Sequence, residues 1–303
     1  MRVLITGATG MIGLALADAV RARGDQVVAV SRDADRGRRV LGPDAEVHPW
    51  VEPTAMPPPP EALRVDAVVH LLGEPIDQRW TPEAKRRIHD SRVLSTRQLV
   101  AGLSGLGEAE RPAVLVSQSA VGYYGDRGDL RLDEDANAGR DWLAGVVEEW
   151  EFAARQAPAG VRVALTRTGV VLSRSGGALS KMLPFFKLGL GGPVAGGRQY
   201  VPWIHLDDVV GGLLRCVEES RATGPANLTA PEPVTNAALS KALGRALGRP
   251  AFLPVPGFAV TLLYGEMSEV VTGSQRAVPV RLQELRYAFR HTDVDAALRD
   301  VLR

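Results

Sequence analysis

The chain has 303 residues, of which 45% are hydrophobic and 23% charged, a composition typical of a globular protein rather than a disordered or membrane-embedded one. Its 36 Lys and Arg residues nearly balance 35 Asp and Glu, and a net charge of +1 gives no electrostatic reason to expect a nucleic-acid or membrane partner. The single cysteine, Cys216, cannot form an internal disulfide and lies in an apolar helical run, which predicts a buried thiol in a reducing compartment.

The first residues already have the pattern of a buried strand, at 2–6, which leaves no room for a signal peptide. No apolar stretch is long enough to cross a bilayer. We therefore expect a cytoplasmic protein.

Strand-like and helix-like patterns alternate through the first half of the chain. Strands are predicted at 2–6, 26–30, 46–48, 66–72, 113–117 and 162–166, and helices at 11–23, 82–103 and 141–155. The prolines at 53 and 57–60 indicate a surface connection, with a proline-rich recognition ligand as the alternative. Repeated strand–helix–strand units predict an α/β fold, a Rossmann-type doubly wound parallel sheet.

The alternation ends near Gly176. We interpret the seven glycines of 176–197 as a flexible substrate-side loop, followed by a helix at 207–219 that Asp207 and Asp208 would cap. Two further helices are predicted at 237–247 and 258–267, and the tail ends in 294–302. The predicted organisation is a Rossmann domain over 1–172, to which helix 207–219 returns. A smaller C-terminal α/β substrate lobe would comprise 173–206 and 225–303.

A glycine-rich loop directly follows the first strand and opens a helix. Its sequence is Gly7-Ala8-Thr9-Gly10-Met11-Ile12-Gly13. In such a loop one glycine permits a tight turn, one allows the backbone to approach a pyrophosphate, and one allows close helix–sheet packing. The helix N-terminus attracts the phosphates. The predicted dinucleotide contacts here are Gly7, Thr9, Gly10, Met11, Ile12 and Gly13.

The end of the second strand indicates which dinucleotide binds. NAD-binding folds usually place an Asp or Glu there to bind the ribose hydroxyls. This chain has Ser31 and Arg32, whose hydroxyl and guanidinium groups suit a 2′-phosphate. We therefore predict NADP(H) as the cofactor. The alternative is that Arg32 is a solvated surface residue.

Three further segments resemble the extended branch of the short-chain dehydrogenase/reductase superfamily: 66–73, 117–125 and 167–172. More narrowly, the segments 188–193, 197–208 and 265–282 resemble an epimerase-like subfamily. That subfamily is labelled nucleoside-diphosphate-sugar epimerase or cell-division-inhibitor-like, and it carries a C-terminal domain of unknown function. The resemblance covers essentially the whole chain.

The resemblance implies additional cofactor contacts. Leu71, Leu72 and Gly73 would pass under the adenine-side ribose and the pyrophosphate, and Val171 would approach the nicotinamide. Arg92 stands where the extended branch commonly has an asparagine. It could reach the cofactor phosphates, or it could form a helix-surface ion pair with Asp90.

The superfamily's usual catalytic pair is Tyr-x-x-x-Lys, and none of the five tyrosines has a lysine four residues later. Leu143 and Val147 occupy roughly the two positions. Ser119 matches the superfamily serine, and Tyr123 or Tyr124 could serve as a substitute acid. The alternative for Tyr124 is a purely packing role.

Substrate contacts are expected from the second lobe. The candidates are Lys181, Arg198, Gln199, Trp203 and His205. A solvated Lys181 and a structural His205 are the alternatives. We predict an NADP-dependent oxidoreductase or epimerase-like enzyme with an unidentified small-molecule substrate. The alternative is a catalytically silent NADPH-binding sensor or regulatory protein. No metal ligand set, nucleic acid or membrane is expected, and the protein is predicted to be a monomer or homodimer.

Overall fold

The computed structural model describes residues 1–303 and contains thirteen strands and twelve α-helices. The strands are β1 (Arg2–Thr6), β2 (Gln26–Ser31), β3 (Glu46–Pro49), β4 (Ala67–His70), β5 (Val114–Ala120), β6 (Arg131–Leu132), β7 (Arg162–Thr168), β8 (Val170–Leu172), β9 (Tyr200–Val201), β10 (Trp203–His205), β11 (Gly224–Leu228), β12 (Val234–Thr235) and β13 (Arg276–Ala277). The helices are α1 (Met11–Ala22), α2 (Ala34–Leu41), α3 (Pro60–Leu63), α4 (Pro82–Ser104), α5 (Trp142–Arg155), α6 (Gly177–Lys187), α7 (Leu206–Glu218), α8 (Asn236–Leu247), α9 (Gly257–Tyr264), α10 (Ser268–Thr272), α11 (Val280–Glu284) and α12 (Val294–Val301). Short 3-10 turns lie at Glu108–Glu110, Val121–Tyr124 and Gly265–Met267.

Seven strands form one parallel sheet in the order β11-β7-β5-β4-β1-β2-β3. The order reverses beside β1, because β2 and β3 lie on one side of it and β4, β5, β7 and β11 on the other. Ligands of open α/β sheets bind at such a switch point, outside the carboxyl ends of the strands. The predicted Rossmann-type sheet is confirmed.

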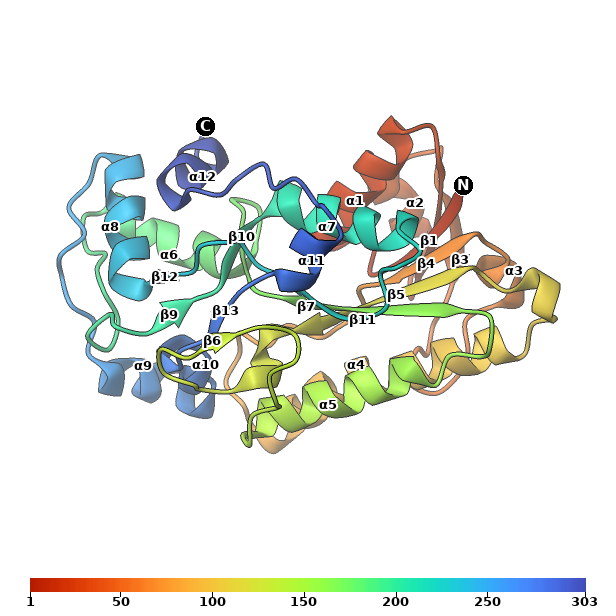
Figure 1. Ribbon diagram of the computed structural model, residues 1–303, viewed down its shortest axis with the longest axis horizontal. Helices are drawn as coiled ribbons and strands as arrows, with labels where there is room; N and C mark the ends of the chain where they lie inside the picture. Colours follow the sequence, from red (N-terminus) through yellow and green to blue (C-terminus); the bar gives the residue numbers. More distant parts are fainter.

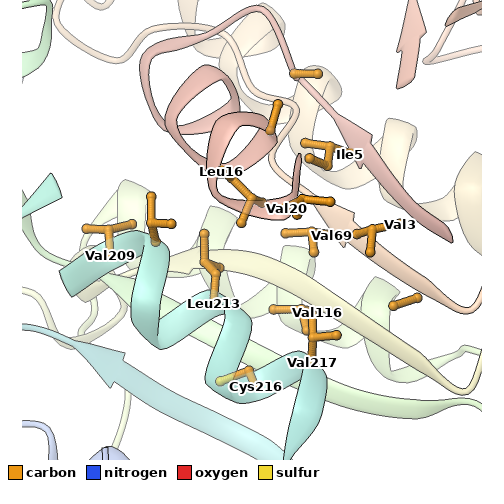
Figure 2. Close-up of a cluster of buried hydrophobic side chains, with 14 of the residues drawn as sticks. Val3, Ile5, Leu16, Val20, Val69, Val116, Val209, Leu213, Cys216 and Val217 are labelled. Atoms are coloured by element: carbon orange, nitrogen blue, oxygen red, sulfur yellow. The ribbon is translucent and has the colours of Figure 1, made fainter. Parts of the chain in front are cut away.

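Helices cover both faces of the sheet (Figure 1), with α1 and α7 on one face and α4 and α5 on the other. Figure 2 shows how Leu16 and Val20 of α1 and Leu213 of α7 pack over strand residues such as Val69 and Val116. Helix α4 buries Leu99 and Leu103 against the opposite face. Because both faces are covered, β1, β2 and β4 are apolar along most of their length rather than alternating, which is why the sequence reveals them.

Cys216 belongs to the core between α7 and the sheet and is fully buried. Burial raises the pKa of its thiol to about 12, because the charged thiolate would lose its hydration. The prediction of a buried thiol is confirmed.

The second half of the chain adds another hydrophobic core. It is formed mainly by α6, α8 and α12 together with Trp203 of β10 and Leu172 of β8. Strands β8 and β10 pair in parallel, outside the main sheet. In Figure 1, α8 and α9 form the left end of the molecule, away from the main sheet.

Three expectations for this half need correction. Residues 177–187 form helix α6 instead of a flexible loop, because Leu179, Leu183 and Phe186 give it an apolar face. Strand β11, expected in the smaller lobe, joins the main sheet beside β7. Leu282 of α11 also packs into the core on the α1–α7 face of that sheet. The domain boundaries themselves stay a prediction.

No helix combines the length and the hydropathy required to span a membrane.

Candidate cofactor and active site

The glycine loop between β1 and α1 lies tightly against its neighbours except at one point. A Cβ on Gly13 would lie 2.3 Å from the Gly7 carbonyl oxygen, and a Cβ on Gly7 would lie 2.8 Å from the carbonyl oxygen of Leu71. Gly7 also has a φ of +67°, which side chains rarely adopt. A Cβ on Gly10 would meet only the Gly7 carbonyl oxygen, at 3.3 Å. The space over Gly10 is therefore the one that a pyrophosphate could fill, and the loop fits a dinucleotide.

The start of α1 favours an anion at the same place. Gly10 is its N-cap and supplies no side-chain acceptor, so the first amide groups of the helix have no capping partner. The first turn also contains no acidic residue. Free amide groups and the positive end of the helix dipole together attract phosphate.

The end of β2 presents a free cation. Arg32 is exposed and forms neither a hydrogen bond nor an ion pair, and the Ser31 hydroxyl donates to the Asp33 carbonyl. The carboxylate of Asp33 is occupied as the N-cap of α2, where it accepts from the Arg36 amide. The carboxylate nearest the strand end is therefore engaged by the first turn of α2, and the residue directly after β2 is a cation.

Two residues, His70 and Arg92, support the backbone turn that follows β4. His70 is fully buried, and its ring nitrogens bond the hydroxyls of Thr6 and Thr96 at 2.7 and 3.0 Å. Burial lowers the pKa of His70 to about 3, so the ring stays neutral. This histidine is absent from the predicted site residues, although a polar residue inside an apolar strand is a usable signal.

Arg92 supports the same turn. Its guanidinium donates to the backbone carbonyls of Glu74 and Ile88, and a Cβ on Gly73 would lie 3.3 Å from its Cζ atom. The ion pair with Asp90 is not formed, because that carboxylate bonds His89. Burial lowers the pKa of Arg92 to about 10. Arg92 thus holds the Gly73–Glu74 backbone in place under the predicted cofactor path.

The segment after β8 covers the glycine loop. A Cβ on Gly176 would lie 3.2 Å from the sulfur of Met11, and one on Gly177 would lie 3.5 Å from the Val171 carbonyl oxygen. Val171 therefore lies near the start of α1, as the nicotinamide assignment requires. The contacts of the predicted cofactor residues with a dinucleotide stay predictions.

Two of the three proposed catalytic residues lie in the protein interior. Ser119 is buried and donates to Glu151 Oε1 at 2.7 Å. Tyr124 is completely buried, and its hydroxyl donates to Asn227 Oδ1 at 2.7 Å while accepting from Arg167. Burial raises the pKa of Tyr124 to about 12. Both hydroxyls are thus engaged inside the protein, which favours the packing role for Tyr124 and gives Ser119 a supporting one.

An ion pair between β7 and α5 organises this interior. Arg167 contacts both carboxylate oxygens of Glu151, at 2.7 and 3.0 Å, and both side chains are almost fully buried. Burial alone would lower the pKa of Arg167, but the hydrogen bonds and charge of Glu151 more than compensate and raise it. This pair is not predictable from the sequence, because its members lie on different elements, although each is a charged residue in an apolar run.

Tyr123 differs from its neighbour. It is half-buried, its ring lies with its centroid 3.5 Å from Arg167 Cζ, and its hydroxyl bonds no protein group. Leu143 and Val147 of α5 are buried, so the helix that usually supplies the acid supplies none at these positions. Of the three candidates, only Tyr123 has a hydroxyl free to contact a substrate.

The residues predicted to contact the substrate differ in exposure. Gln199 is buried and donates to the backbone carbonyls of Val194 and Val271. Trp203 is fully buried, with its indole N–H bonded to the Glu232 carbonyl. Neither side chain faces solvent, so the structure gives both a structural role instead of the expected substrate contact.

The two basic candidates remain exposed. Lys181 of α6 pairs with Asp77 at 2.5 Å and donates to its carbonyl at 3.0 Å, which joins α6 to the segment after β4. Arg198 is exposed and forms no ion pair. Both are placed to meet a solvent-borne ligand, and their role as substrate contacts stays a prediction.

His205 caps α7, so the expected cap by the two aspartates needs correction. Its Nδ1 accepts from the Asp207 amide at 3.1 Å, and its buried ring stacks on His291 at a centroid distance of 3.7 Å. Its Nε2 lies 3.5 Å from Asp300 Oδ2. Asp208, also fully buried, accepts from Tyr287 and from the amides of 290 and 291. Both residues thus tie α7 to the C-terminal segment.

Sequence comparison gives the family. The profile described as "NAD dependent epimerase/dehydratase family" matches residues 3–228, which include the glycine loop and all seven strands of the main sheet. The chain belongs to this family. A second profile, "Domain of unknown function (DUF1731)", matches residues 255–301. The resemblance to the epimerase-like subfamily is confirmed.

Relatives within the family match over the full length of the chain. The "Epimerase family protein SDR39U1 homolog, chloroplastic" of Arabidopsis thaliana is 39% identical over 303 residues, covering 100% of this chain and 87% of the relative. The crystal structure of the human epimerase family protein SDR39U1 (isoform 2) with NADPH superposes with a TM-score of 0.90 at 35% identity, covering 99% of each chain. A nucleoside-diphosphate sugar epimerase from Corynebacterium glutamicum has a TM-score of 0.77 at 33% identity, covering 98% of this chain and 57% of that one.

Proposed function

We propose that this epimerase-family protein is an NADP(H)-dependent oxidoreductase or epimerase-like enzyme whose small substrate carries a carbonyl or hydroxyl group. The observation that carries the proposal is the pairing of an open cradle at Gly10 with an unpartnered guanidinium, Arg32, at the end of β2. Phosphate groups bind at both kinds of position. The human relative, crystallised with NADPH, supports the same cofactor here.

The proposed cofactor contacts come from four segments of the chain. The amide groups at the start of α1 would bind the pyrophosphate, and Ser31 and Arg32 the 2′-phosphate. The backbone of Leu71–Gly73, braced by Arg92, would lie beneath the cofactor, and Val171 would approach the nicotinamide. When bound, NADPH would supply a hydride, and NADP⁺ would accept one.

The protein's own contribution to the chemistry is the proton. We assign it to Tyr123, because its hydroxyl has no protein partner and lies in the turn that follows β5. A general acid must be within hydrogen-bond reach of the group that it protonates. Arg167, which is fixed by its ion pair with Glu151, packs against one face of the Tyr123 ring. This contact would position Tyr123, as a helix positions the tyrosine of the usual pair.

The buried, unpaired Cys216 supports a reducing compartment such as the cytoplasm as the place where the enzyme works.

Turnover tests this function directly. The full-length protein is incubated with NADPH and a panel of aldehydes and ketones, and in the reverse direction with NADP⁺ and alcohols, while cofactor absorbance is followed. We expect cofactor-dependent turnover of at least one compound. An absence of turnover across both panels, with NADPH demonstrably bound, would contradict an oxidoreductase.

A further inference from the structure

Two segments in the second half of the chain contain no acidic residues. Neither 174–206 nor 233–265 includes an Asp or Glu, whereas together they contain seven basic residues. The whole chain has 35 acidic residues in 303, so about eight would be expected in segments of this combined length. The net charge of the whole chain, +1, therefore conceals a strongly cationic region.

The two acid-free segments lie side by side. The Val255 amide donates to the Pro193 carbonyl at 2.8 Å, and the Ala195 amide donates to the Val255 carbonyl at 2.9 Å. The Leu253 amide also donates to Gly191. Helices α8 and α9, which the second segment contains, form the left end of the molecule in Figure 1. The positive charge is thus concentrated at one end.

The same end carries a concentration of exposed apolar side chains. Of fifteen large hydrophobic residues exposed on the chain, eight belong to these two segments. Phe258, Leu262 and Leu263 of α9 are 70–76% exposed, Phe252 is 71% exposed and Leu188 is 73% exposed. Soluble monomers rarely gather such side chains without a partner that covers them.

A basic pocket of about 530 Å³ lies within this end. Lys241, Arg245, Arg249 and Phe252 are among the nine residues that line it, and none of the nine is acidic. Arg245 is paired with Asp295, whereas Lys241 and Arg249 have no carboxylate partner. The pocket thus offers two cationic side chains without carboxylate partners beside an exposed aromatic ring. This combination suits an amphipathic ligand with an anionic group and an apolar chain.

The acidic residues that flank this end are partly neutralised. Asp77 pairs with Lys181, Glu266 pairs with Lys85, and Asp295 pairs with Arg245. Glu232 and Glu269 are exposed at the margins without such partners. Asp293 and Asp300, at the ends of the C-terminal segment that packs against α8, are exposed acids beside it as well, so the excess of positive charge belongs to the acid-free segments themselves.

We propose that this end of the molecule docks on an anionic lipid bilayer, with α9 and Phe252 inserted into the interface and Lys241 and Arg249 binding a phospholipid headgroup. Basic and apolar side chains on one surface are the combination that binds anionic membranes. A second copy of the chain fits less well, because a symmetric dimer would place like charges opposite each other. The membrane here is a surface to lie on, not one to cross.

Vesicle sedimentation tests the docking. The full-length protein is mixed with vesicles of phosphatidylcholine alone or of phosphatidylcholine containing phosphatidylglycerol, at low and high salt. We expect sedimentation only with the anionic vesicles and release by salt, because surface charge is screened over about 10 Å at ordinary ionic strength. Failure to bind the anionic vesicles, or equal binding to both vesicle types, would overturn the proposal.

Paired variants locate the surface. Lys241→Glu/Arg249→Glu should weaken vesicle binding at least about tenfold, since each basic residue contributes on the order of 1 kcal/mol near such a surface. Phe258→Ser/Leu262→Ser should weaken it similarly with the charge unchanged. The controls Arg97→Glu and Phe152→Ser alter exposed residues on α4 and α5 and should bind as the unaltered protein does.

The same variants distinguish a protein partner from a bilayer. Thermal melting first checks that each variant is folded. If the unaltered protein is oligomeric without lipid and Phe258→Ser/Leu262→Ser makes it monomeric, the surface is an interface between copies and the proposal is overturned. Unchanged vesicle binding by both double variants would also overturn it.

Discussion

The guanidinium of Arg167 stacks on the ring of Tyr123, with Cζ 3.5 Å from the ring centroid. Glu151 fixes that guanidinium through both of its carboxylate oxygens, and Tyr124 and the Glu134 carbonyl accept from its far side. Tyr123 is thereby held by a buried charged group and not by a lysine on its own helix. This arrangement separates residues that we expect to affect catalysis from those that we expect to affect stability.

Tyr123→Phe should slow NADPH turnover by roughly two to four orders of magnitude, the usual contribution of a general acid. Its affinity for NADPH should stay nearly unchanged, because the hydroxyl is assigned to the substrate. Tyr124→Phe is the matched comparison. It should retain turnover and lose about 1–3 kcal/mol of unfolding free energy, since Asn227 and Arg167 lose a buried partner. Full turnover by Tyr123→Phe would refute the assignment.

Glu151→Gln should destabilise the fold by about 3 kcal/mol or more, because it leaves the Arg167 charge buried without a counter-charge. Glu148→Gln, an exposed change on the same helix, should alter stability by no more than about 0.5 kcal/mol. Urea unfolding of the three proteins measures the difference. Equal midpoints for both variants would show that the ion pair contributes little.

Two glycines of the loop should behave differently. Gly10→Val should abolish NADPH binding in a folded protein, because its side chain would fill the space over the loop and meets only one protein atom. Gly13→Ala should also lower stability, because its Cβ would lie 2.3 Å from the Gly7 carbonyl oxygen and 2.7 Å from the Ala8 Cα. Calorimetric titration and thermal melting separate the two effects. A Gly10→Val protein that binds NADPH normally would mean that the loop is only a turn.

Acid should destabilise the protein through its buried histidines. Burial lowers the pKa of His70 to about 3, and burial together with the charge of His291 lowers that of His205. The unfolded chain binds these protons below about pH 6.5, whereas the folded chain does not. Their contribution to stability is therefore complete above about pH 6.5 and is lost as the pH falls, by up to about 1.4 kcal/mol per pH unit for His70.

The measurement is urea unfolding at a series of pH values between about pH 7 and pH 5. His70→Gln should show a shallower loss of stability on acidification, and His48→Gln, at a surface ion pair, should serve as the control. Identical pH dependence of stability in His70→Gln and the unaltered protein would show that His70 does not cause the loss of stability in acid.

The sequence predicts the first half of this fold well, because each buried parallel strand and each helix that follows it has a recognisable pattern within its own residues. Residues 2–31 show this, since an apolar strand, a glycine turn, an amphipathic helix and a second strand follow one another in order. Helix α6 was missed because its flanking glycines and Pro184 indicate a loop, although Leu179, Leu183 and Phe186 have helical spacing. Packing against the second core outweighs those local signals.

The interior network could not be predicted in the same way. Nothing local shows that Ser119, Glu151 and Arg167 meet, because a strand, a helix and another strand bring them together. Net charge likewise averages over the chain and hides where charges gather. By contrast, the glycines of 7–13 follow one another in a known loop, and the open space over Gly10 fits a dinucleotide; the contacts of the other predicted cofactor residues stay predictions.

The most direct test of the account is calorimetric titration of NADPH and NADH into the unaltered protein, Arg32→Asp and the control Arg39→Asp. We expect the unaltered protein and Arg39→Asp to bind NADPH more tightly than NADH. Arg32→Asp should lose or reverse that preference, because it removes the phosphate partner and adds a like charge. Equal affinities of the unaltered protein for the two cofactors, or an unchanged preference in Arg32→Asp, would contradict the account.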